Sequence, residues 1–186
     1  RLGVDVTLTR LWKLEDLDND GVADKRTQLA DGFAYTGNAA DVHGPFLHPN
    51  GRLYWCHGRK GHEVYQNDDK SLVSKGKGAR IWSCLPDGSD IQVHAGGGMD
   101  NPTELTFTPE GDILGSVNLF YGRPRGDTLV HWLYGGAYPR HDQQAVTAEF
   151  KRTGDLLKEV HNFGHVAVSG LCRYRSDTLG NEFRGN

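Results

Sequence analysis

The sequence lacks the features that would place it in a membrane, in a disulfide framework or on nucleic acid. No apolar stretch in its 186 residues approaches the roughly 18–20 residues that a membrane helix needs. Its three cysteines lie far apart and form no CxxC pair, and an odd number argues against a complete set of disulfides. The formal net charge is -3, so no basic field predicts a nucleic-acid partner. We therefore expect a soluble segment without a transmembrane span, whose core is built from short apolar runs.

Sequence motifs typical of a known catalytic or cofactor chemistry are also missing. The sequence has no GxSxG, no glycine-rich phosphate loop and no CxxCH haem motif. Among the nine histidines, His57 and His62 are close in sequence but have no partner at a spacing typical of zinc. Helix signals are confined to residues 147–163, and Gly154 interrupts that pattern.

What the sequence does have is glycine and repeated strand patterns. Its 25 glycines exceed the average share of about 7% and predict many turns. GPFLHPNGRLYWCHG from Gly44 and ELTFTPEGDILGSVN from Glu104 each predict two strands around a Pro-x-Gly turn. A weaker third copy, SGLCRYRSDTLG, begins at Ser169. These repeats predict an all-β chain of hairpins.

A second repeated element contains tryptophan. Residues 10–14 (RLWKL) match residues 80–84 (RIWSC), and His131 begins a degenerate copy, HWL. Each copy predicts a strand. A short PDG turn and the strand IQVHAG follow the second copy, whereas DLDNDGVADKR and the strand KRTQLADG follow the first. The acidic stretch is therefore predicted to be an insertion in the outer hairpin of one repeat unit.

Units of this length with four short strands each are typical of β-propeller blades. We predict that residues 1–186 form one domain, a partial β-propeller of about three blades within a longer chain. The alternative is a β-sandwich built from unrelated hairpins.

The acidic stretch has the spacing of a calcium loop. The predicted ligands are the carboxylates of Asp16, Asp18, Asp20 and Asp24 and the main-chain carbonyl of Val22. Without a cation, four carboxylates within nine residues repel one another. The alternative is a solvated acidic turn.

The repeat alignment places a set of polar residues where the inner strands begin and end, around the channel of a propeller. His43 beside Asp41 is a candidate catalytic base, because imidazole titrates near neutrality. Asn101 begins the next inner strand, and Arg123 and Arg125 are candidates for binding an anionic cofactor or substrate. The alternatives are a hydrogen-bonded structural histidine and a solvated arginine loop.

Five stretches, in chain order, resemble the family classed as membrane-bound dehydrogenases, which is abundant in planctomycetes and their relatives. They are DVHGPFLHPNGRLYW, ARIWSCLPDGSD, GGGMDNPTELTFTPEGDILGS, HWLYGGAYPR and SGLCRYRSDTLGNEFRGN. That family is similar to the soluble quinoprotein sugar dehydrogenases, which are six-bladed propellers of the NHL and quinoprotein-dehydrogenase type. In those enzymes pyrroloquinoline quinone (PQQ) lies in the channel together with calcium.

The resemblance implies a PQQ-dependent dehydrogenase that oxidises a hydroxyl group of a sugar or another alcohol. His43 would take the hydroxyl proton, and Asn101, Arg123 and Arg125 would hold the cofactor or the substrate. The family also implies a small-molecule or carbohydrate substrate and a location in the periplasm, outside the cell or in the cell envelope. A haem c domain with a CxxCH motif is expected elsewhere in the full-length chain.

Two positions depart from the pattern of the quinoprotein enzymes. Their catalytic histidine corresponds to a position near Ala40, three residues before His43. Their cofactor-binding Arg-Asn-Pro corresponds to residues 100–102, where Asp100 replaces the arginine and is expected to repel a tricarboxylate quinone. The second functional hypothesis is therefore a carbohydrate- or protein-binding propeller with a structural calcium loop and no turnover.

Overall fold

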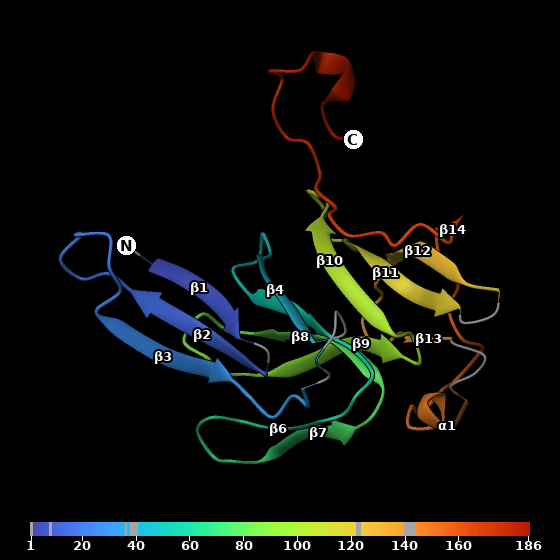
Figure 1. Ribbon diagram of the computed structural model, residues 1–186, viewed down its shortest axis with the longest axis horizontal. Coiled ribbons are helices and arrows are strands. Elements are labelled where there is room, and N and C mark those ends of the chain that lie inside the picture. The colour runs from blue at the N-terminus through green and yellow to red at the C-terminus, as the bar shows by residue number, and fades with distance from the viewer. Residues whose placement is uncertain (1, 8, 36, 38–40, 122–123, 140–143) are drawn as a thin grey trace.

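The computed structural model describes residues 2–7, 9–35, 37, 41–121, 124–139 and 144–186, and they form a nearly all-β structure (Figure 1). The first sheet has the order β1-β2-β3, with antiparallel neighbours. Its strands are β1 (Leu2–Thr7), β2 (Arg10–Glu15) and β3 (Lys25–Ala30).

Two further sheets follow, with antiparallel neighbours except for β13, which pairs parallel with β9. The second has the order β13-β9-β8-β5-β4 and the third β10-β11-β12-β14. The second contains β4 (Val42–Leu47), β5 (Leu53–His57), β8 (Ala79–Cys84), β9 (Gln92–Gly97) and β13 (Ala137–Tyr138). The third contains β10 (Asn101–Phe107), β11 (Ile113–Tyr121), β12 (Gly126–His131) and β14 (His161–Gly164).

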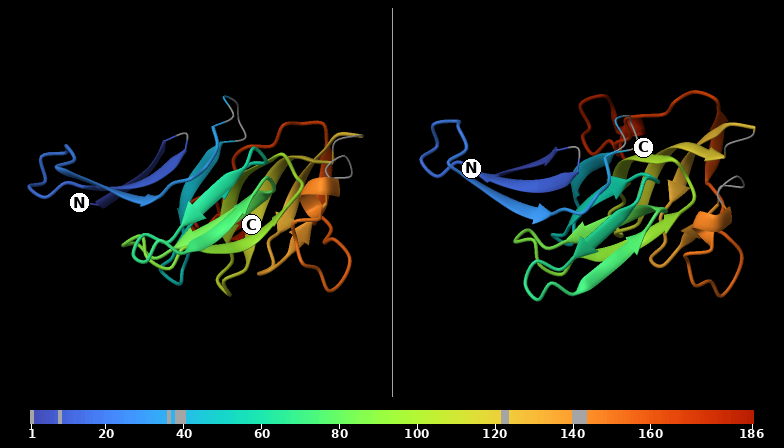
Figure 2. Two further views of the ribbon diagram at one scale, coloured as in Figure 1. Left: turned by 90° about the horizontal axis from the view of Figure 1, so that it is seen from below. Right: turned by 60° about the horizontal axis from the view of Figure 1, so that its bottom comes forward.

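The three sheets stand side by side like successive blades (Figure 2). Alternate side chains of the middle sheet point to opposite faces, as the pleat of a strand requires. Trp55 and Trp82 pack toward the first sheet, with Leu11 and Leu29. Cys56 and Ile81 pack toward the third sheet, in a cluster with Leu105, Phe107 and Val130. The core thus lies between blades, and the predicted all-β propeller fold is confirmed.

The two hairpins predicted around the Pro-x-Gly turns are also confirmed. The turns of β4–β5 and β10–β11 have the same hydrogen bonds, from His48 N to Arg52 O at 3.0 Å and from Thr108 N to Asp112 O at 3.0 Å. Each turn closes on a glycine with positive φ, 86° and 96°, which a residue with a side chain adopts only at a cost.

The tryptophan elements occupy equivalent strands. Trp12 and Trp82 lie in β2 and β8, and Trp132 directly follows β12. Trp82 and Trp132 are fully buried between the sheets. The acidic stretch joins β2 to β3, which are neighbouring strands. Its predicted place in the outer hairpin of a blade is therefore correct.

Three parts of the chain differ from expectation. An additional hairpin, β6 (His62–Tyr65) and β7 (Leu72–Gly76), interrupts the second blade between β5 and β8. The helix α1 covers only Gln144–Thr147, and part of the remaining helical pattern forms β14 instead. A short 3-10 turn, Asn181–Phe183, follows near the C-terminus.

The third copy predicted from Ser169 forms no strand. Its main chain bonds to side chains of the third sheet: Ser116 Oγ donates to Ser169 O at 2.9 Å, and Arg173 N donates to Thr106 Oγ1 at 3.0 Å. The C-terminal residues fold back on this copy, with Tyr174 N bonded to Asn186 O at 2.7 Å. No helix in the described ranges is long and apolar enough to cross a membrane.

Candidate functional site

The candidate site lies where the first strands of the second and third blades begin. β4 begins at Val42 and β10 at Asn101, and each is the first strand of its blade along the chain. His43 Nε2 lies 3.0 Å from Asn101 Oδ1, so a hydrogen bond joins the two blades. Asn101 is buried, whereas His43 is half-buried. The structure therefore brings together two of the residues that the sequence predicted for this site.

Asp41 is also close enough to this site to interact electrostatically with the neighbouring His57. It is 6% exposed and directly precedes β4. Burial lowers the pKa of His57 to about 4, the nearby Asp41 raises that pKa in part, and His43 lowers it. Because Asp41 and His43 both act on His57, the predicted pair lies beside a further imidazole that is uncharged at neutral pH. The role of His43 as a base stays a prediction.

Glu104 was not predicted from the sequence as a site residue, although it lies in β10 close to Asn101. Burial raises the pKa of its carboxyl group, and the charge of His43 lowers it in part. Glu104 and His43 therefore attract each other when both are charged. Its position could have identified it, because Glu104 is the fourth residue of the predicted inner strand that Asn101 begins.

Asp100 differs from what its sequence position suggested. The expectation was an uncompensated negative charge that repels an anionic cofactor. Instead, the carboxylate of Asp100 forms an ion pair with the guanidinium of Arg59. Arg59 N also donates to Asp100 O at 3.3 Å, so the end of β5 is tied to the start of β10. Because Arg59 balances the charge of Asp100, the expected repulsion is largely removed.

Arg125 has a local partner. Its Nε lies 3.2 and 3.1 Å from the two carboxylate oxygens of Asp127, whose side chain is 0% exposed. Asp127 also accepts hydrogen bonds from the main-chain N–H groups of Leu119, Val166 and Ala167 at 2.8–3.0 Å. Although burial raises the pKa of Asp127, these bonds outweigh it and keep the pKa below its ordinary value. Arg125 thus anchors the loop before β12, and its predicted binding of a cofactor stays a prediction.

Two of the expected positions cannot be placed in this geometry. Arg123 and Ala40 lie outside the described residues.

The acidic loop gathers three of its four carboxylates. One oxygen each from Asp16, Asp18 and Asp24 lies within 4.8 Å of the others. Asp20 is not part of this group, and its Oδ1 accepts a hydrogen bond from Val22 N at 2.7 Å. Oxygen ligands of a shared calcium ion lie at about 2.3–2.6 Å from it, and therefore at most about 5 Å apart. The three carboxylates fit such an ion, while calcium binding itself stays a prediction.

Comparison with known protein families gives one match that covers nearly the whole chain. The model of a domain of unknown function, DUF7133, matches residues 4–186. The chain belongs to the DUF7133 family. No curated protein matches this DUF7133 chain. Its assignment to the planctomycete dehydrogenases stays a prediction.

Solved structures with a similar arrangement include two bacterial proteins. One is a protein from Thermus thermophilus assigned as an oxidoreductase (glucose dehydrogenase), with 14% identity, a TM-score of 0.41, and coverage of 94% of this chain and 69% of the other. The second is the PQQ-bound aldose sugar dehydrogenase of Streptomyces coelicolor, with 13% identity, a TM-score of 0.42, and coverage of 93% and 68%.

Proposed function

We propose that this chain is part of a PQQ-dependent dehydrogenase, in which a hydroxyl group of a sugar or another alcohol is oxidised in the channel. The observation that supports this most is the hydrogen bond between His43 Nε2 and Asn101 Oδ1 at 3.0 Å. It holds an imidazole at the start of two inner strands, where a ligand in the channel of a propeller can reach it. A fixed imidazole is the most common general base in enzymes.

The acceptor atom on Asn101 determines which nitrogen of His43 acts as the base. An amide oxygen only accepts hydrogen bonds, so Nε2 carries the hydrogen that His43 donates to Asn101. Nδ1 is then the unprotonated nitrogen and takes the hydroxyl proton. The attraction between His43 and Glu104 stabilises the imidazolium that this transfer forms. Asn101 is thus the positioning residue, and Glu104 the charge that favours proton transfer.

PQQ, when bound, supplies the acceptor for the hydride. A tricarboxylate needs cationic partners, and the described cation at the start of β10 is Arg59, whose charge Asp100 already balances. Arg125 is engaged by the buried carboxylate of Asp127. These residues do not form an anion site for three carboxylates. The proposed role of His43 therefore concerns the substrate proton alone.

Calcium in this proposal is structural. Asp16, Asp18 and Asp24 offer hard oxygen ligands in the loop between β2 and β3. That loop lies at the far end of the first blade from β4 and β10 (Figure 1). An ion there would remove the repulsion among the carboxylates and fix the outer hairpin.

The test uses the full-length protein with calcium and PQQ. Saturable quenching of tryptophan fluorescence by PQQ and dye-linked oxidation of a sugar are expected. His43→Gln should keep the quenching but lower the oxidation rate by about 10²–10⁴-fold. Glu104→Gln should lower it less. The absence of both quenching and oxidation across a panel of sugars and alcohols would exclude the dehydrogenase.

The second candidate function is a carbohydrate- or protein-binding propeller without turnover. The ion pair between Arg59 and Asp100 favours it, because a charge-balanced site suits a neutral, hydroxyl-rich ligand better than a tricarboxylate. Saccharide binding without PQQ quenching, together with a calcium-dependent rise in thermal stability, is the result expected from it.

The cellular location and the further domains of the protein are proposed from the family resemblance. A location in the periplasm or cell envelope and a haem c domain elsewhere in the full-length chain stay predictions. So does the assignment of residues 1–186 to a single partial propeller domain.

A further inference from the structure

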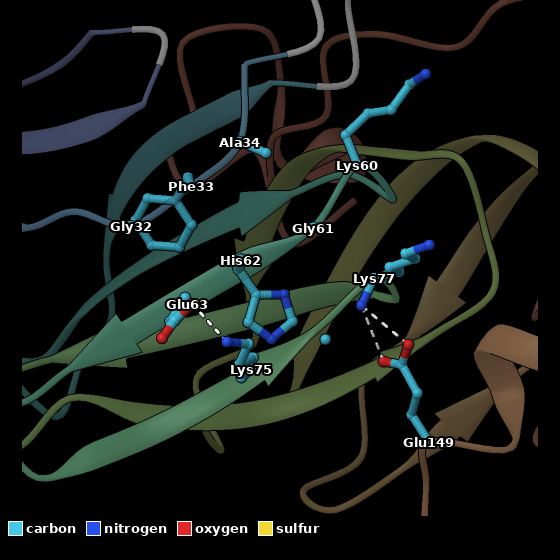
Figure 3. A pocket seen from close by; sticks show the side chains of 11 residues that line it. Gly32, Phe33, Ala34, Lys60, Gly61, His62, Glu63, Lys75, Lys77 and Glu149 are labelled. Carbon is cyan, nitrogen blue, oxygen red and sulfur yellow. Dashed lines mark hydrogen bonds and ion pairs between the residues drawn. The ribbon is translucent and has the colours of Figure 1, made fainter.

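A cavity separate from the His43 site lies between the β6–β7 hairpin and the segment that connects the first two blades (Figure 3). Its volume is about 620 Å³, within the range of about 300–1,000 Å³ that is usual for small-molecule sites. Neither His43 nor Asn101 lines it. The cavity therefore belongs to a different part of the fold.

The walls are held together by main-chain hydrogen bonds between two blades. Glu63 N donates to Gly32 O at 2.8 Å, and Ala34 N donates to Gly61 O at 2.9 Å. A Cβ atom on Gly32 would lie 2.0 Å from Glu63 O, and one on Gly76 would lie 2.3 Å from Glu149 Oε2. Glycine at these positions lets the backbone form the cavity wall directly.

The floor is uncharged. Phe33 and His62 are 4% and 5% exposed. His62 Nε2 is bonded to Ser74 Oγ at 2.9 Å, while Nδ1 has no hydrogen-bond partner among the described residues. Burial, and to a lesser extent the charge of Arg80, lowers the pKa of His62 to about 3. At neutral pH this ring therefore contributes no positive charge, and it leaves one hydrogen bond unused.

The rim is cationic. Lys60, Lys75 and Lys77 line it together with Glu63 and Glu149. Both carboxylates are already engaged. Glu63 pairs with Lys75 Nζ at 2.8 Å, and Glu149 accepts hydrogen bonds from the main-chain N–H of Lys77 at 2.9 and 3.1 Å.

Glu149 also forms an ion pair with the buried Arg80, whose Nη2 lies 3.2 Å from Glu149 Oε2. The ion pairs of the described chain therefore leave the ammonium groups of Lys60 and Lys77 without a carboxylate. In Figure 3 the side chain of Lys60 extends upward from the top of the cavity, and that of Lys77 extends outward beside Glu149. Two uncompensated cations beside a neutral floor favour a ligand with one anionic group.

We propose that this cavity binds an acidic saccharide of about monosaccharide size. Its oxyanion, a carboxylate, sulfate or phosphate, binds Lys60 and Lys77, and its hydroxylated ring lies over the Phe33 and His62 floor. The wall carbonyls of Gly32 and Gly61 are already hydrogen-bonded, so Nδ1 of His62, which has no partner among the described residues, is the group proposed to bond a ring hydroxyl. This proposal does not depend on the dehydrogenase proposal, because it uses none of the same side chains.

Isothermal titration of the full-length protein with glucuronate, glucose 6-phosphate, glucose 6-sulfate, glucose, inorganic phosphate and inorganic sulfate tests the proposal. At least one acidic sugar should bind saturably and about tenfold or more tightly than glucose. The double variant Lys60→Gln/Lys77→Gln should weaken that binding by about tenfold or more. Lys158→Gln, an exposed lysine outside the cavity, is the matched control and should leave it unchanged. His43→Gln should also leave it unchanged, which separates this site from the channel.

The outcomes are distinct. An acidic sugar that binds more tightly than the matching inorganic anion supports the full proposal, and the preferred oxyanion identifies the source of the charge. Equal binding of glucose, equal binding of the inorganic anion, or binding that the double variant retains overturns it. Both lysines are exposed, so the double variant should remain folded, and circular dichroism with thermal unfolding verifies this. An absence of binding by every probe also overturns the proposal.

Discussion

Lowering the pH from 7 to 5 should destabilise this chain through two buried histidines. His57 and His62 are 0% and 5% exposed, and burial lowers their pKa values from 6.5 to about 4 and about 3. In the unfolded chain both imidazoles bind a proton as the pH falls through 6.5, whereas in the folded chain they stay neutral. Their contribution to stability is therefore fully present above pH 6.5 and is lost as the pH falls toward 4 and 3.

The size of the effect follows from these pKa values. Each pH unit below 6.5 favours the unfolded state by about 1.4 kcal/mol per histidine until the folded-state pKa is reached. At pH 5 the loss is about 2 kcal/mol for each, and about 4 kcal/mol for the pair. A loss of that size is a large fraction of the roughly 5–15 kcal/mol by which native domains are stable.

Urea unfolding at pH 7, 6 and 5, followed by tryptophan fluorescence, measures this dependence. The variant His62→Gln should be less stable at pH 7 but should lose about 2 kcal/mol less than the wild type between pH 7 and 5. His161→Gln, at an exposed position, is the control and should keep the wild-type pH dependence. If His62→Gln loses as much stability on acidification as the wild type, the buried neutral imidazole is not the cause and the reasoning is wrong.

Three further predictions concern single positions. Asp127→Ala should lower the free energy of unfolding by at least about 2 kcal/mol in urea unfolding, because it leaves Arg125 and three main-chain N–H groups without their acceptor; a loss below about 0.5 kcal/mol would contradict this. Gly32→Ala should cost several kcal/mol in the same assay, since its φ is +91° and a Cβ would lie 2.0 Å from a carbonyl oxygen. The matched change Gly135→Ala, at φ +73° with open space around it, should cost only about 1 kcal/mol. Calcium should raise the unfolding temperature of the wild type, by the equivalent of about 2.7 kcal/mol at 100 times Kd, but not that of Asp18→Asn; an equal rise in both would exclude the acidic loop as the site.

Local patterns in the sequence were sufficient for the hairpins. Pro-x-Gly turns set the register of β4–β5 and β10–β11, because the turn fixes which residues pair. The tryptophan elements were predictable for a similar reason, since each copy carries aromatic and β-branched or other large apolar residues that favour a strand. The same alignment brought His43 and Asn101 to the starts of neighbouring inner strands.

Contacts between residues distant in sequence were not predictable in this way. The ion pair of Arg59 with Asp100 joins the end of β5 to the start of the next blade. Its existence depends on how two blades pack, and no spacing within one strand encodes it. The helical pattern at residues 147–163 failed for a related reason. β12 offers a free edge, and β14 pairs with it at His161 and Asn162, so tertiary pairing overrides a weak helix propensity.

The two candidate sites differ in how far the propeller repeat determines them. His43 and Asn101 lie at the starts of equivalent strands, so the propeller repeat itself determines that the residues at these two positions are neighbours. The acidic-sugar cavity instead depends on β6 and β7, which lie between β5 and β8, whereas only residues 122–125 separate the corresponding strands β11 and β12. The described residues of the third blade thus contain no comparable hairpin, and the cavity is a feature of this insertion. A family member with the hairpins of the repeat but without residues 62–76 should therefore keep the channel site and lose the binding of acidic sugars.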